Sequence, residues 1–95
     1  MFTRSSFIEI VNHRRDPIVI VSGILLCAVN GAGKTRIIYK VGLSSAQVDK
    51  YLPLLLRSEL LVALGRNMKP LYKTTPKGKV FLETFDVLNR LLDQN

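Results

Sequence analysis

The stretch of sequence that decides the fold runs from Gly33 to Arg57 and is GKTRIIYKVGLSSAQVDKYLPLLLR. In its first part, apolar residues recur with the three- and four-residue spacing of a helix, which predicts a short helix that holds Ile37, Ile38 and Val41. Thr35 is the expected N-cap of this helix. Gly42 is expected to end it, because glycine readily adopts the left-handed conformation found at helix C-termini.

A second helix is predicted over 45–57, with Ser44 or Ser45 as its N-cap. One arc of this helix is apolar and consists of Val48, Tyr51, Leu52, Leu55 and Leu56. The opposite side carries Ala46, Gln47, Lys50, Leu54 and Arg57. The pattern therefore predicts an amphipathic helix with a partly basic outer face. Pro53 lies in its middle, where it removes one backbone hydrogen bond and can kink the axis.

A further helix is predicted before this stretch. Asp16 can cap free backbone amides and Pro17 suits the first helical position, so the helix is expected over about 17–29. The run from Ile18 to Val29 is uncharged, but its 12 residues are too few to span a bilayer. We therefore expect a buried helix and no membrane contact.

Beyond residue 60 the pattern changes to that of a β-hairpin. Strands are predicted over 61–64 and 71–74, with a polar turn between them. Thr75-Pro76 repeats the combination of a cap and a proline, and opens a last helix that extends to about residue 92. The order helix, helix, turn, helix, hairpin, helix predicts a mostly α fold with a small β-hairpin (α+β), namely a winged helix-turn-helix.

We expect a single domain over 1–95, because 95 residues suffice for one modest core. It divides into an N-terminal extension (1–15), the helix-turn-helix and wing (16–75) and a C-terminal helix (76–95). Within the extension, Ser6 and Glu9 have the spacing of a capping box. This spacing predicts a short helix near 7–13, with a short strand as the alternative.

Positive charge is concentrated in the middle of the chain. The net charge of the whole chain is +7, and the segment from Lys34 to Lys79 has ten basic residues against only Asp49 and Glu59. This distribution indicates a polyanionic partner, with double-stranded DNA as the natural candidate. The alternative is a basic surface that is merely solvated.

Several short motifs resemble the small archaeal winged helix-turn-helix regulators. They are GAGKTRIIYK at 31–40, Leu43-Ser44, Lys50-Tyr51-Leu52 and YKTTPKG at 72–78, and they keep the family's order and spacing over about residues 16–92. The resemblance implies a DNA-binding regulator or chromatin protein that dimerises through its C-terminal helix. Pro53 departs from the family, which usually has an ordinary helix former there, and the last helix is short for a long coiled coil.

The outer face of helix 45–57 is the predicted DNA-reading surface, because a helix fits the major groove and its N-terminal residues reach base edges. Gln47 can pair with adenine, Ala46 can contact a thymine methyl group, and Lys50 can reach guanine or a phosphate. Phosphate contacts are predicted for Lys34, Thr35, Ser44, Ser45, Lys73 and Lys77, and Arg36 is also predicted to bind DNA. Arg66 and Lys69 at the hairpin tip are predicted to enter a minor groove or to grip the backbone beside it. An ordinary solvated helix face is the alternative.

The last helix has more apolar surface than one small core needs. One stripe has coiled-coil spacing and consists of Phe81, Phe85, Leu88 and Leu92; a second consists of Val80, Val87 and Leu91. Because one stripe can pack on the domain while the other meets a partner, a homodimer is predicted. Its expected interface residues are Phe81, Phe85, Leu88, Leu91 and Leu92. A single wide face buried within one chain is the alternative.

No catalytic site, cofactor or metal is predicted. Gly33-Lys34-Thr35 matches only the end of a phosphate-binding loop, since Ala28 stands where the pattern needs its leading glycine. His13 is the only histidine and has no partners at metal-ligand spacing. Cys27 is the only cysteine and is expected to be a small buried hydrophobe; since no intrachain disulfide is possible, a cytoplasmic protein is expected, and DNA binding would place it on the nucleoid.

The leading hypothesis is therefore a non-enzymatic protein that binds double-stranded DNA, in a sequence-dependent or an architectural manner. The alternative is a winged-helix module that binds another protein and never DNA. Pro53 and Leu54 on the outer face of helix 45–57 favour this alternative mildly, whereas the charge of the central segment favours DNA.

Overall fold

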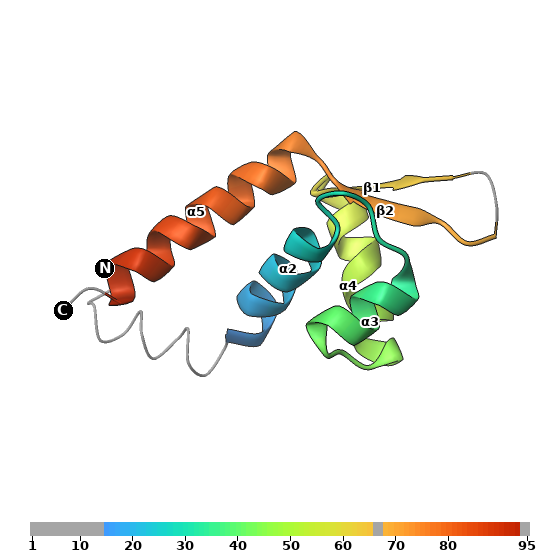
Figure 1. Ribbon diagram of the computed structural model, residues 1–95, viewed down its shortest axis with the longest axis horizontal. Helices are drawn as coiled ribbons and strands as arrows, with labels where there is room; N and C mark the ends of the chain where they lie inside the picture. Colours follow the sequence, from blue (N-terminus) through green and yellow to red (C-terminus); the bar gives the residue numbers. More distant parts are fainter. Residues whose placement is uncertain (1–14, 66–67, 94–95) are drawn as a thin grey trace.

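The computed structural model describes residues 15–65 and 68–93. Its elements in chain order are α2 (Arg15–Cys27), α3 (Lys34–Val41), α4 (Ser45–Arg57), β1 (Leu61–Leu64), β2 (Leu71–Thr74) and α5 (Pro76–Asp93). Figure 1 shows α2, α3 and α4 gathered in the centre, with the hairpin projecting at one end and α5 extending toward the other. The predicted α+β architecture is confirmed, while the element predicted near 7–13 lies outside the described residues.

Helix α2 begins earlier than predicted, at Arg15, so Asp16, expected to precede the helix, and Pro17, expected to open it, both lie within its first turn. A proline is tolerated there because the first backbone amides of a helix have no acceptor within the helix. The helix also ends earlier than predicted, at Cys27, where the chain enters a turn that contains Gly31 at φ 96°. Cys27, expected to be buried, is half-buried.

Helix α3 begins at Lys34, and its N-cap is Gly33, which makes no side-chain capping bond. The prediction of Thr35 as the cap was therefore wrong by two residues. The predicted C-terminus is confirmed, since Gly42 adopts the left-handed conformation (φ 78°, ψ 41°) and its amide donates to the carbonyl of Ile38. Three residues then suffice to turn the chain into α4.

Helix α4 has the predicted bounds, and Ser44 is its N-cap. The predicted apolar arc faces the core, with Val48, Tyr51, Leu52 and Leu55 buried. Pro53 is exposed, and the helix continues through it to Arg57. Because the proline lies on the outer side, the missing backbone bond is next to solvent and not in the core.

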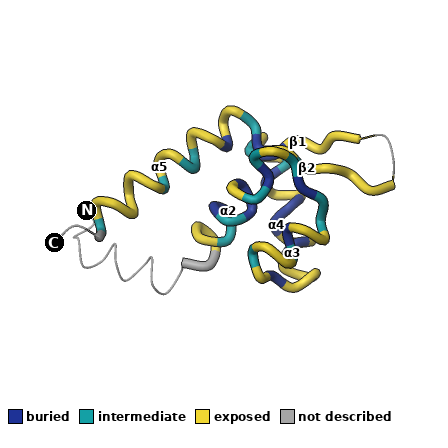
Figure 2. Tube along the Cα trace, in the orientation of Figure 1, coloured by how far each residue is buried: buried dark blue, intermediate teal, exposed yellow. Residues whose placement is uncertain are grey.

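The core lies where α2, α3, α4 and β1 meet. Its largest fully buried side chains come from each of these elements and are Ile24, Leu25, Ile37, Val48, Leu55 and Leu61. Figure 2 shows the buried residues concentrated in this region, whereas α5 is mostly exposed along its length. Burial of each such side chain stabilises the fold by about 1.5–3 kcal/mol, so these contacts fix how α3 and α4 are oriented.

The hairpin is an antiparallel pair in which Leu61 pairs with Thr74 and Leu64 with Leu71. A third strand-like segment joins it, because Ala32 forms an isolated bridge with Tyr72 through two reciprocal bonds of 2.8 Å. Gly31 precedes this bridge, and a Cβ atom there would lie 2.9 Å from Leu71 Cδ2. The bridge ties the hairpin to the segment that leads into α3.

The start of α5 is held against the end of α4. Thr75 Oγ1 donates to the carbonyl of Glu59 (2.6 Å) and accepts from the amide of Gly78 (3.0 Å), which confirms Thr75 as a cap. Farther along, Phe81 and Leu82 are half-buried against the core. α5 therefore packs along α2 with its first turns and extends beyond the core.

Candidate nucleic-acid interface

The outer face of α4 is open to solvent, as the sequence predicted. Its exposed residues are Ala46, Gln47, Lys50, Leu54 and Arg57. Lys50 Nζ lies 5.7 Å from the centroid of the Tyr51 ring, at the distance of a cation–π contact. The helix thus presents a partly basic surface with one large apolar residue, Leu54, of which 43% is exposed.

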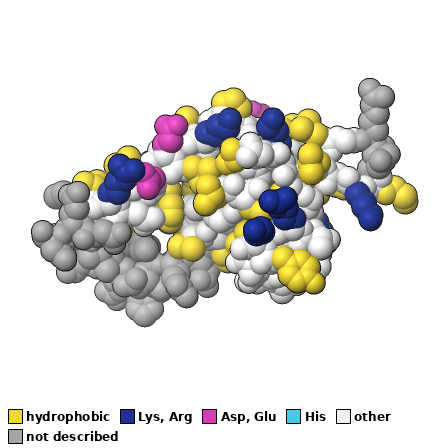
Figure 3. Space-filling view, in the orientation of Figure 1, with side chains coloured by type: hydrophobic (Ala, Val, Ile, Leu, Met, Phe, Trp, Pro, Cys, Tyr) yellow, Lys and Arg dark blue, Asp and Glu magenta, His cyan; other side chains and the backbone are white. Residues whose placement is uncertain are grey.

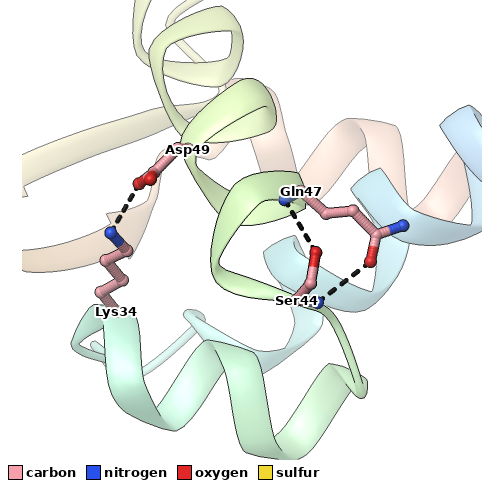
Figure 4. A network of polar contacts seen from close by, with 4 residues as sticks. All are labelled: Lys34, Ser44, Gln47 and Asp49. Atoms are coloured by element: carbon pink, nitrogen blue, oxygen red, sulfur yellow. Dashed lines mark hydrogen bonds and ion pairs between the residues drawn. The ribbon is translucent and has the colours of Figure 1, made fainter.

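Ser44 and Gln47 form a complete capping box at the N-terminus of α4 (Figure 4). Ser44 Oγ accepts from the amide of Gln47 (3.1 Å), and Gln47 Oε1 accepts from the amide of Ser44 (3.0 Å). The side-chain oxygen of Gln47 is therefore engaged, and its Nε2 group points away from the cap with two donors. A bidentate contact with adenine needs both the oxygen and the nitrogen, so the oxygen must either accept a second hydrogen bond or leave the cap.

Lys34 and Asp49 connect the beginning of α3 to α4. Lys34 Nζ lies 2.5 Å from Asp49 Oδ1, and the two side chains point toward each other across the space between the helices (Figure 4). Both side chains are considerably exposed, 42% and 61% respectively. Lys34, which was predicted to contact a DNA phosphate, is thus already paired with a carboxylate of α4, the predicted DNA-reading helix.

A groove of about 630 Å³ lies between the start of α3 and the tip of the hairpin. We call it the phosphate groove; its lining residues are Gly33, Lys34, Thr35, Arg36, Met68, Lys69, Pro70 and Tyr72. The structure thereby brings together four residues predicted from the sequence to contact DNA: Lys34, Thr35, Arg36 and Lys69. Figure 3 shows basic side chains over the region of α3 and near the end of the hairpin.

Lys73 and Lys77, which were also predicted to contact DNA, lie apart from this groove. Lys73 follows Tyr72 on β2, and since successive side chains of a strand alternate, Lys73 is on the opposite face of the hairpin. Lys77 Nζ donates to the carbonyl of Ser58 (2.9 Å), at the base of the hairpin. Arg66, the remaining residue predicted at the hairpin tip, lies outside the described residues.

The two apolar stripes of α5 differ in exposure. Phe81, Phe85 and Leu92 of the first stripe are half-buried, and Phe85 lines an apolar cavity of about 480 Å³ together with Val19 and Leu26 of α2. The second stripe is open, with Val80, Val87 and Leu91 exposed by 60%, 52% and 61%. Leu88 lies between these extremes at 38%. The first stripe therefore faces α2, and the second faces solvent.

The order of helices and strands described above is that of a known family. A family model described as "winged helix-turn-helix" matches residues 14–93, which is most of the chain. The chain belongs to the winged helix-turn-helix family. In the terms of that family α3 and α4 are the helix-turn-helix, and the β1–β2 hairpin is the wing. A search among curated proteins finds no significant sequence match.

Solved structures agree with this assignment. Sso10a-2, a DNA-binding protein from Sulfolobus solfataricus, is 27% identical over 78% of each chain, with a TM-score of 0.73. AF1382 from Archaeoglobus fulgidus is 11% identical over 86% of this chain and 92% of its own, with a TM-score of 0.71. The homodimeric winged helix-turn-helix DNA-binding domain of Mb0332 from Mycobacterium bovis is 14% identical over 100% and 94%, with a TM-score of 0.64.

Four residues that line the phosphate groove were not among the predicted site residues: Gly33, Met68, Pro70 and Tyr72. Met68 is 96% exposed at the tip of the wing and lines the groove beside Lys69. Minor-groove proteins commonly insert apolar side chains between base steps, and a methionine in an otherwise polar wing turn was the available signal. In residues 15–65 and 68–93, no group of His, Cys, Asp and Glu could hold a metal ion, and no helix could cross a membrane.

Proposed function

We propose that this winged-helix protein binds double-stranded DNA as a transcription regulator or chromatin protein, with α4 in the major groove and the wing beside it. The observation that carries the proposal is the phosphate groove, where Lys34, Arg36 and Lys69 of two separate elements line one concave surface. A DNA backbone that leaves the major groove can pass there between helix and wing. Sso10a-2, which has the same fold, is described as a DNA-binding protein.

The roles of the residues follow from their positions. Ser44 and Ser45 lie at the N-terminus of α4, where free amides favour a phosphate, and the groove residues Lys34, Thr35, Arg36 and Lys69 hold the backbone. Gln47 offers its Nε2 donors to a base edge, with Ala46 and Lys50 on the same exposed face. Lys73 and Lys77 add long-range attraction that does not depend on sequence.

The proposal includes a homodimer built on α5, with the stripe of Val80, Val87 and Leu91 at its centre and Leu88 at its edge. In a monomer the side chains of this stripe are more than half exposed, and soluble monomers tend to avoid apolar patches of this kind. A twofold dimer buries the same surface of both copies and sets two α4 helices for successive turns of the major groove. The related Mb0332 domain is described as homodimeric.

The decisive experiment is fluorescence anisotropy of labelled duplex DNA across a salt series. Because binding rests on phosphate contacts, log affinity should fall linearly with log salt, with a slope of about −0.9 per phosphate neutralised. No binding at low salt, or affinity independent of salt, contradicts the proposal. We propose a binding protein that acts in the cytoplasm, on the nucleoid, without a catalytic step.

A second candidate function is a winged-helix module that binds a protein. The observation in its favour is the apolar content of the helix-turn-helix surface, where 43% of Leu54 and 82% of Tyr39 are exposed. Duplex DNA separates the two functions, because a module that binds only protein should show no affinity for it at low salt. Under the first proposal, substitution of Leu54 by Ser should leave DNA affinity within about twofold, since Leu54 is far along α4 from the end that reaches the bases.

A further inference from the structure

A second cavity lies on the other side of α3, between α2 and α3, with a volume of about 640 Å³. We call it the α2–α3 cleft. Helix α2 contributes Val19, Leu26 and Cys27 to its walls, and α3 contributes Arg36, Lys40 and Val41. No residue of α4 or of the wing lines it, so it is separate from the surface assigned to base recognition. Its volume is in the range of pockets for small molecules.

The charged side chains that line the cleft are all basic, and they stand on one wall. Arg36 and Lys40 stand one turn apart on α3, an arrangement of like charges that destabilises a helix unless an anion lies between them. No aspartate or glutamate is among the described lining residues. The opposite wall is apolar, with Leu26 exposed by 69% and Val19 by 41%. Figure 3 shows hydrophobic and basic side chains next to each other in this part of the surface.

We infer that the α2–α3 cleft binds a small amphipathic carboxylate, whose anionic group pairs with Arg36 and Lys40 while its apolar body covers Val19 and Leu26. A carboxylate is ionised at neutral pH and accepts charge-assisted hydrogen bonds from both cations. The apolar wall selects against small inorganic anions, because only a ligand with an apolar body removes Leu26 from water.

The cleft is also connected to DNA binding through one residue. Arg36 lines both the α2–α3 cleft and the phosphate groove, whereas Lys40 lines only the cleft. A carboxylate that engages Arg36 therefore competes with a DNA phosphate for the same guanidinium group. This regulatory part rests on the proposed DNA binding; occupation of the cleft by a carboxylate does not.

Cys27 provides a direct readout of occupation, because it lines the cleft and is the only cysteine of the chain. The probe is 2-naphthoate, and 2-naphthylmethanol is its neutral control. The rate of alkylation of Cys27 by iodoacetamide, followed by mass spectrometry, should fall as the probe fills the cleft. At nine times the Kd the rate should be about tenfold lower, since only the free fraction reacts.

Two variants test which residues hold the anion. Lys40→Gln should weaken protection of Cys27 by 2-naphthoate at least about tenfold, because a charge-assisted bond is lost. Arg90→Gln removes the same charge from α5, outside the cleft, and should keep full protection. No protection up to about 5 mM probe, equal protection by the neutral alcohol, or full protection in Lys40→Gln overturns the inference.

The DNA arm of the experiment separates the two proposals. Saturating 2-naphthoate should lower the DNA affinity of the unmodified protein about fivefold, relative to acetate at the same ionic strength. Lys40→Gln should bind DNA normally and need at least about tenfold more probe for the same loss of DNA affinity. If DNA binds but the probe has no effect, the regulatory link is overturned. If the unmodified protein binds no DNA without the probe, the proposed function fails. The alkylation of Cys27 still shows whether the cleft binds a carboxylate.

Discussion

Thr74 Oγ1 donates a hydrogen bond of 2.6 Å to the carbonyl oxygen of Leu25, which lies 49 residues earlier in the chain. This carbonyl is at the end of α2, and the amide of Val29, its usual partner in a continuing helix, bonds to Leu26 instead. The amide of Thr74 donates to the carbonyl of Ala28 at 3.0 Å. One residue of the wing thus caps the C-terminus of the central helix.

Thr74→Val should destabilise the protein by about 1–3 kcal/mol, because the change leaves the buried carbonyl of Leu25 without its donor while it preserves side-chain shape. Thermal unfolding followed by circular dichroism measures the effect. Thr84→Val is the matched control, since Thr84 Oγ1 bonds to the carbonyl of Val80 on the exposed side of α5. Equal stability of the Thr74 and Thr84 variants would contradict the capping role.

Gly78→Ala should also destabilise the protein, by about 1–3 kcal/mol, because the added methyl group overfills its site. A Cβ atom at Gly78 would lie 2.5 Å from the carbonyl oxygen of Leu60 and 2.6 Å from Thr74 Cγ2. The backbone of α5 must move to accommodate it. Lys79→Ala, at the exposed neighbouring position, should leave the unfolding temperature nearly unchanged. If urea denaturation gives both variants the same midpoint, the close approach has no energetic consequence.

Asp49→Asn should tighten DNA binding by about threefold at low salt, because it frees Lys34 from its ion pair and removes a negative charge from the DNA-facing helix. The gain should shrink as ionic strength rises. Asp86→Asn removes an equal charge on α5, where the carboxylate pairs with Arg90, and should have little effect. Weaker DNA binding in the Asp49 variant would mean that the ion pair positions Lys34 for its phosphate.

Gln47→Glu should leave the stability of α4 unchanged, because glutamate accepts the amide of Ser44 in the same capping box. It replaces the Nε2 donors by a carboxylate, so DNA binding should weaken. The difference in affinity between a duplex selected from a random pool and an unselected duplex should narrow by about 1–3 kcal/mol if Gln47 reads a base. Equal losses on both duplexes would exclude base reading by this residue.

Val87→Glu and Leu91→Glu should convert the dimer to a monomer without unfolding it, since both side chains are more than half exposed in one protomer. Phe85→Glu should instead destabilise the protein, because it places a carboxylate in the apolar cavity that Phe85 lines between α2 and α5. Sedimentation equilibrium at micromolar concentration gives the mass of each variant. A monomer mass for the unmodified protein would refute the dimer and leave the open stripe of α5 without a partner.

The sequence analysis placed the dimer interface mainly on the first stripe of α5, whereas in the structure Phe81 and Phe85 of that stripe are half-buried toward α2 and the second stripe is open. The spacing of the two stripes is the same kind of apolar repeat, so periodicity alone does not tell which stripe meets α2. The choice depends on the angle at which α5 leaves the wing. That angle is held by Thr75 bonded to Glu59 and by the close approach of Gly78 to Leu60. These contacts join the start of α5 to the α4–β1 connection, and no local sequence pattern predicts them.

The start of α3 is a second case in which a tertiary contact, and not the local sequence, sets the structure. Thr35 was the best local cap, but the bridge between Ala32 and Tyr72 keeps the chain extended until Gly33, and the helix begins directly after it. A backbone bridge to a strand 40 residues later leaves no signal in the sequence around Thr35. The predicted cap was wrong because a tertiary contact determines where the chain can first turn into a helix.

The sequence by itself determined the elements of this protein: the turn at Gly42, a serine cap at 44 or 45, the bounds and buried arc of α4, and the two strands of the wing. These depend on backbone conformation and on apolar spacing within a few residues, and such signals are local. Only the tertiary structure decided that Asp49 opposes Lys34, that Gln47 is held in a cap, and that Arg36 lies between two cavities. Those relationships depend on how the helices cross, which is set by close packing of side chains that are distant in the chain.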